Sequence, residues 1–150
     1  MALRDGLMEQ IKDAMRAKAA ERLSALRLIL NGLKEREIAL RGEGAAMTEA
    51  DELTVLAKMV KQRQESVKVY LEGARQDLAD KESAEIRVIE EFLPKQLGAA
   101  EVEAAVAAAV AEVGAASVKD MGRVMAVLKG KYTGRMDFGA VGALIKARLG

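Results

Sequence analysis

The apolar residues of this chain recur every three or four positions, and this spacing limits the available folds more than any other feature. Leu3, Leu7, Ile11 and Met15 are each four residues apart, and the valines between residues 102 and 113 repeat a spacing of three or four. Residues spaced in this way share one face of an α-helix, whereas a half-buried strand alternates apolar and polar side chains. No segment sustains such an alternation. The sequence therefore predicts an all-α fold.

Apolar stripes and helix-end signals together divide the chain into seven predicted helices. Four long antiparallel helices are expected first, over about residues 2–18, 20–42, 48–73 and 77–93. Three shorter helices are expected after them, over about residues 99–114, 117–128 and 137–149. Polar side chains that can accept hydrogen bonds from the first amides of a helix are expected to cap four of these segments, namely Thr48, Asp77, Ser117 and Asp137.

Single residues within these helices allow more local predictions. Ile38 is placed on the inner face of the second helix. Glu49, Asp51 and Glu52 are interpreted as carboxylates that stabilise the positive end of the dipole of the third helix. Gly122 lies inside the sixth predicted helix, where glycine costs about 0.5–1 kcal/mol relative to alanine. We therefore expect Gly122 to mark the close approach of another helix or of a ligand.

The only proline of the chain gives the clearest predicted boundary. Pro94 disfavours helical geometry in the residue before it, and Gly98 follows within the same short segment. We therefore expect an N-terminal helical domain at residues 1–93, a linker at residues 94–98 and a C-terminal three-helix domain at residues 99–150.

The chain contains no histidine and no cysteine, which removes the commonest general base and the thiolate nucleophile. Gly130 and Lys131 do not complete a phosphate-binding loop, because Met125 and Tyr132 occupy positions that the motif reserves for glycine and for serine or threonine. We predict no catalytic residue, no cofactor and no metal site. The longest apolar run, residues 104–111, is far shorter than the ~18 residues of a membrane span, so we expect no membrane partner and a cytoplasmic location.

The C-terminal segment carries an excess of positive charge. Residues 114–150 contain seven basic and two acidic side chains, and such an asymmetry suggests a polyanionic partner. Glycines permit close backbone approach, and a tyrosine ring can stack on a base. The residues predicted to face nucleic acid are Lys119, Gly122, Arg123, Lys129, Lys131, Tyr132, Gly134 and Arg135. A plain connection between two helices is the other interpretation of the segment from Lys129 to Arg135.

Three short motifs in this half of the chain resemble a known family. They are Glu91–Leu97 (EFLPKQL), Lys119–Met125 (KDMGRVM) and Gly134–Asp137 (GRMD), and their order and spacing are similar to those of the YqeY (GatB/YqeY) family. The last part also resembles the tail of GatB, the B subunit of the tRNA-dependent amidotransferase, in which a helical tail contacts tRNA and other domains perform the chemistry. Among the predicted site residues, Lys119, Gly122, Arg123, Gly134 and Arg135 match the family pattern, whereas Ala140 stands where members often have a basic residue.

The resemblance implies a GatB-tail-like C-terminal domain and a tRNA-related role. We therefore expect a non-catalytic tRNA-binding accessory protein that acts with an amidotransferase or an aminoacyl-tRNA synthetase. The resemblance alone would also assign this chain carbon–nitrogen ligase activity with glutamine as amido-N-donor. The alternative is a helical protein–protein interaction adaptor that binds no RNA.

Overall fold

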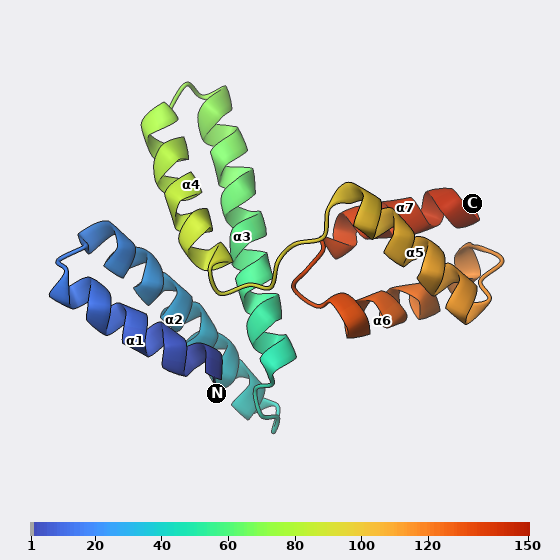
Figure 1. The fold of residues 1–150 in the computed structure, drawn as a ribbon, viewed down its shortest axis with the longest axis horizontal. Helices are drawn as coiled ribbons and strands as arrows, with labels where there is room; N and C mark the ends of the chain where they lie inside the picture. The colour runs from blue at the N-terminus through green and yellow to red at the C-terminus, as the bar shows by residue number, and fades with distance from the viewer. Residues whose placement is uncertain (1) are drawn as a thin grey trace. The chain divides into compact units, whose positions relative to one another are not determined.

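The computed structural model describes residues 2–150, and its regular elements are all helical (Figure 1). The helices are α1 (Ala2–Arg16), α2 (Ala20–Gly42), α3 (Glu49–Glu72), α4 (Gln76–Glu90), α5 (Ala99–Val113), the short 3₁₀ turn η1 (Val118–Asp120), α6 (Met121–Tyr132) and α7 (Phe138–Leu149). The described part of the chain contains no strand. The predicted all-α fold is therefore confirmed.

Internal contacts divide the chain into two compact units, Met1–Pro94 and Lys95–Gly150. We call them the N-terminal unit and the C-terminal unit. Each has a hydrophobic core of its own, and the two cores share no residue. The prediction that residues 1–93 and 99–150 are separate domains joined by a linker concerns independent folding, and it stays a prediction. None of the helices in the described part of the chain is both long and apolar enough to cross a membrane.

The N-terminal unit consists of two helical hairpins, α1 with α2 and α3 with α4 (Figure 1). All four helices contribute to one core, whose buried members are Leu7, Ile11, Ala14, Leu26, Ile29, Leu33, Leu56 and Ile89. Thr48 caps α3 as predicted. Its hydroxyl accepts a hydrogen bond from the Asp51 amide at 3.1 Å, while the Asp51 carboxylate accepts one from the Thr48 amide at 2.8 Å.

Several local predictions for this unit are wrong. Ile38 is 65% exposed, and Leu40 is buried in its place. The reason is the angular register of α2, because Leu40 lies seven residues after the buried Leu33 and returns to the same face, whereas Ile38 does not. Asp77 is not the cap of α4, since the helix begins at Gln76 and the Asp77 carboxylate binds the Arg75 guanidinium at 3.0 Å instead. The helix also ends at Glu90, three residues before the predicted end.

The C-terminal unit packs α5, α6 and α7 around a second core. Its buried residues are Ala105, Val106, Ala109, Val124, Leu128, Met136, Val141 and Ile145. Gly114 ends α5 in the left-handed conformation, with a φ of +69°. Asp137 caps α7 as predicted, because its carboxylate accepts a hydrogen bond from the Gly139 amide at 2.9 Å. Where α6 and α7 meet, a Cβ atom on Gly142 would lie 3.4 Å from the terminal methyl of Met121.

Candidate nucleic-acid interface

The segment predicted as a loop from Lys129 to Arg135 is mostly helical. Helix α6 runs through Tyr132, four residues beyond its predicted end at Leu128. Val124, Leu128 and Tyr132 are spaced by four, and all three pack in the second core, so burial of this stripe extends the helix through Gly130. The connection itself is the turn from Thr133 to Asp137.

The turn is held firmly against residues 95–97 of the same unit. The Leu97 amide donates to the Arg135 carbonyl at 2.9 Å, and the Gln96 side-chain amide donates to the Gly134 carbonyl. Arg135 donates from Nε to the Lys95 carbonyl at 3.1 Å. Gly134 is buried and left-handed, with a φ of +77°. Among the glycines of the predicted loop, only Gly134 therefore has a backbone conformation that favours glycine.

Two of the predicted site residues form a pair at this turn. The Arg135 guanidinium carbon lies 5.9 Å from the centroid of the Tyr132 ring, within the range of a cation–π interaction. Tyr132 also packs against the second core. Its ring therefore contributes to folding of the C-terminal unit as well as to its surface.

Lys131 points to a different side of α6 from Lys129. Side chains two positions apart on a helix do not face each other. The Lys131 ammonium group lies 2.9 Å from a carboxylate oxygen of Glu112 on α5, and this hydrogen bond raises the pKa of Lys131. The structure therefore does not bring Lys129 and Lys131 together on one surface.

The outward side of α6 is small and positively charged. Its exposed residues are Gly122, Arg123, Ala126, Lys129 and Gly130, which we call the α6 face. A Cβ atom on Gly122 or on Gly130 would meet no other atom within 4 Å. The prediction that Gly122 marks a close helix approach is therefore wrong for the packing of the fold. That approach occurs at Gly142 instead.

Asp120 and Lys119 lie at the start of this face, in η1. The Asp120 carboxylate accepts hydrogen bonds from the Ala116 amide at 2.9 Å and from the Ser117 amide at 3.3 Å, and it also binds the Arg123 guanidinium. These three interactions lower the pKa of Asp120, with the Ala116 amide as the largest cause. Asp120 thus fixes Arg123 at one end of the α6 face, and exposed Lys119 directly precedes this carboxylate.

The eight predicted residues therefore fall into separate groups. Gly122, Arg123 and Lys129 share the α6 face, with Lys119 at its start. Tyr132, Gly134 and Arg135 belong to the turn and its packing, and Lys131 lies on the side of α5.

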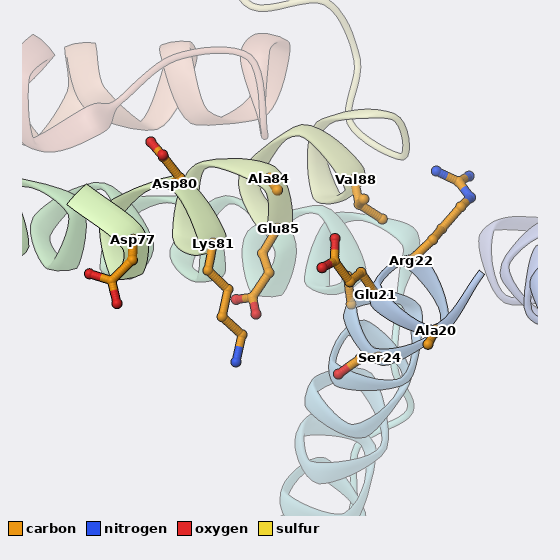
Figure 2. Close-up of a pocket in the computed structure, with 11 residues that line it drawn as sticks. Ala20, Glu21, Arg22, Ser24, Asp77, Asp80, Lys81, Ala84, Glu85 and Val88 are labelled. Atoms are coloured by element: carbon orange, nitrogen blue, oxygen red, sulfur yellow. The ribbon is translucent and has the colours of Figure 1, made fainter. Parts of the chain in front are cut away.

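A groove in the N-terminal unit is a second candidate site, which the sequence did not reveal. It has a volume of about 810 Å³ and lies between the first turns of α2 and one side of α4 (Figure 2). Small and apolar side chains line part of it, namely Ala20, Ser24, Ala25, Ala84 and Val88. Of its charged residues, Arg22 binds Glu91 at 2.7 Å and Glu85 binds Arg63 at 3.0 Å. The groove could not be predicted because its two walls, residues 20–25 and 77–88, lie far apart in the chain.

These features define a two-unit helical protein whose candidate site is a basic helix surface. Across residues 2–150 no three carboxylate, imidazole or thiol side chains are grouped in a way that could hold a metal ion. The family model of the Yqey-like protein matches residues 4–149. The chain belongs to the YqeY family, which confirms the family predicted from the sequence motifs.

Several curated relatives of this chain have the same name, "Altered inheritance of mitochondria protein 41, mitochondrial". The protein from Clavispora lusitaniae is 38% identical over 92 residues, which cover 61% of this chain and 52% of the relative. The protein from Vanderwaltozyma polyspora is 35% identical over 91 residues, covering 59% and 46%. That from Saccharomyces cerevisiae is 33% identical over 87 residues, covering 58% and 46%. The chain thus spans about half the length of the curated relatives that it matches.

Proposed function

We propose that this YqeY-family protein is a non-catalytic accessory protein that binds tRNA through the α6 face and Lys119. The observation that carries the proposal is the pair of exposed glycines, Gly122 and Gly130, inside a helix that would be more stable without them. Neither glycine has a positive φ, and neither makes room for a neighbouring side chain.

Each glycine in a helix interior costs about 0.5–1 kcal/mol relative to alanine, and neither Gly122 nor Gly130 is required by a positive φ or by close packing within the C-terminal unit. A surface without large side chains lets a phosphate backbone come close to the helix. Lys119, Arg123 and Lys129 would then neutralise phosphates, which is the main source of RNA affinity.

The variant Gly122→Ala/Gly130→Ala tests this proposal. Two added methyl groups should raise the melting temperature of the C-terminal unit, because alanine favours the helix. The same methyl groups should weaken the binding of unfractionated tRNA, measured by fluorescence anisotropy at low salt. Gly6→Ala is the matched control, since Gly6 is also an open glycine within a helix, α1, but lies in the N-terminal unit.

A second variant removes the positive charges. Replacing Lys119, Arg123 and Lys129 by alanine should lower tRNA affinity at least tenfold, about 1.4 kcal/mol. The slope of log affinity against log salt, about −2 to −3 for the parent protein, should approach zero. The control replaces Lys34, Lys58 and Lys68, which are exposed in the N-terminal unit. Equal losses in both triple variants, or no tRNA binding by the parent protein, would contradict the proposal.

The groove between α2 and α4 supports a second candidate function, that of a protein–protein adaptor. An amidotransferase or an aminoacyl-tRNA synthetase is the protein partner that we propose for the tRNA-binding function, whereas the adaptor of this second candidate binds no RNA. Ala84→Arg would fill the groove with a long side chain (Figure 2). An adaptor that uses this groove would lose its protein partner in that variant and keep any affinity for tRNA. The cytoplasm is the location that we propose for either function, whereas the names of the curated relatives place those proteins in mitochondria.

A further inference from the structure

Glu52 has a buried carboxyl group in the N-terminal unit. It lies near the start of α3, four residues before the fully buried Leu56, and is 1% exposed. Its carboxyl oxygen Oε2 is buried and has no hydrogen-bond partner among the described residues. The predicted interaction with the helix dipole does not account for this burial, because Asp51 supplies the cap and Glu52 points inward.

The positive charge with the largest effect on Glu52 belongs to Arg4 of α1, but the Arg4 guanidinium binds other groups. Its Nη1 atom lies 2.5 Å from the Glu37 carboxylate of α2, and its Nη2 atom donates to the Leu33 carbonyl at 3.4 Å. The Nε atom of Arg4 is buried without a partner in the described structure. Arg4 therefore forms its ion pair with Glu37.

A buried carboxyl group in this situation is held more easily with its proton than without it. Removing an ionised carboxylate from water costs several kcal/mol unless hydrogen bonds and a paired charge replace the water. Burial accordingly raises the pKa of Glu52; the charge of Arg4 acts in the opposite direction, and the nearby Glu49 carboxylate adds to the rise.

We propose that Glu52 is a proton-operated latch that fastens the start of α3 to the α1–α2 hairpin. In its neutral form the side chain stays buried, and the first turns of α3 remain seated beside the C-terminal half of α2 (Figure 1). In its ionised form it recruits water, and these turns separate locally from the hairpin. The charged groups that act on it are Arg4 on α1, Glu37 on α2 through its pair with Arg4, Glu49 on α3 and the amino group of the chain.

The direction of the pH effect follows from proton linkage. The folded protein holds this proton more tightly than the unfolded chain does. Stability from the latch is therefore fully present below the ordinary glutamate pKa of about 4.3, and it is lost as the pH rises to the higher value of the folded state. The latch releases with increasing pH.

Hydrogen exchange followed by NMR between pH 5 and pH 9 tests this inference, after correction for the intrinsic exchange rate. In the parent protein, protection of the amides of residues 53–56 should fall at least tenfold over this range, while amides of the C-terminal unit stay constant. Glu52→Gln and Glu52→Leu should each abolish the fall, because neither side chain ionises. Glu49→Gln, a change of an exposed carboxylate in the same turn, should preserve it.

Several results would overturn the latch. One is a flat profile in the parent protein, and another is an equal fall in the Glu52→Gln variant. A loss of protection spread evenly over the N-terminal core would assign the carboxyl a role in global stability without local release. A carboxyl titration midpoint for Glu52 at or below the ordinary glutamate value, measured by ¹³C NMR, would also exclude it. The chain's amino group, whose charge opposes the rise in the pKa of Glu52, is common to all variants.

Discussion

At the scale of single residues, Asp120 connects the fold of the C-terminal unit to its proposed binding surface. Its carboxylate accepts hydrogen bonds from two backbone amides that precede η1, and it also binds the Arg123 guanidinium. The same side chain therefore replaces missing backbone hydrogen bonds and orients a cation of the α6 face. A change at this position should affect stability and RNA binding by separate routes.

We expect Asp120→Asn to remove part of the acid sensitivity of the C-terminal unit. The pKa of Asp120 is lowered in the folded protein, so its stabilising effect is present above the unfolded value of about 3.9 and is lost as the pH falls through the folded value. The melting temperature of the parent protein should therefore drop more steeply than that of the variant between about pH 4 and pH 2. Asp5→Asn, which changes an exposed carboxylate of α1, is the control. Parallel curves for the parent and Asp120→Asn would contradict this role.

At the scale of secondary structure, glycines of the C-terminal unit have opposite roles. Gly114 adopts a left-handed conformation that ends α5, and Gly130 lies within α6 in an ordinary helical conformation. Neither would bring an added methyl group within 4 Å of another atom. The effect of an alanine at each position should therefore come from the backbone conformation alone.

Gly114→Ala should lower the free energy of unfolding by about 1–2 kcal/mol, because an L-residue with a side chain is strained in the left-handed region. Gly130→Ala should raise it by up to about 1 kcal/mol, because alanine is the better helix former. Urea denaturation followed by circular dichroism would measure both. The same sign for the two variants would show that packing or binding surfaces, and not backbone conformation, control these positions.

At the scale of the whole molecule, the central feature is the presence of two separate cores. Leu33 is fully buried in the N-terminal core, and Leu128 is fully buried in the C-terminal core. Part of the predicted linker, residues 94–98, packs with the C-terminal unit. Leu97 contacts the second core, and its amide donates a hydrogen bond to the Arg135 carbonyl. Two cores of this kind are expected to unfold as separate units.

Replacing either leucine by alanine should therefore destabilise one unit only. A buried Leu→Ala change typically costs 2–5 kcal/mol, which is comparable to the total stability of a helical unit as small as the C-terminal one. Leu128→Ala should remove hydrogen-exchange protection from α5, α6 and α7, and leave α1 to α4 protected. Leu33→Ala should lower protection in the N-terminal unit alone. Joint loss of protection in both units would show that the chain folds as one cooperative domain.

Local chemistry explains what the sequence determined. The four-residue apolar spacing predicted an all-α chain, and Thr48 and Asp137 predicted the starts of the helices that they cap. These features depend on hydrogen bonds and backbone preferences within a few residues, so they can be recognised without knowledge of the fold. The family also followed from short motifs, and the match over residues 4–149 confirms it.

Tertiary packing decided the features that depend on which side of a helix meets a neighbour. Helix α6 continues through Gly130 because burial of Leu128 and Tyr132 outweighs a glycine cost of about 1 kcal/mol. Packing within the N-terminal unit exposes Ile38 and buries Glu52. Packing of α6 in the C-terminal unit directs Lys129 and Lys131 to different sides of that helix. Charge and glycine content indicated a candidate surface near residues 119–135, but only the contacts among α5, α6 and α7 showed which of its residues face outward together. The groove between α2 and α4 arises from segments far apart in the chain, and local sequence contains no signal for such a contact.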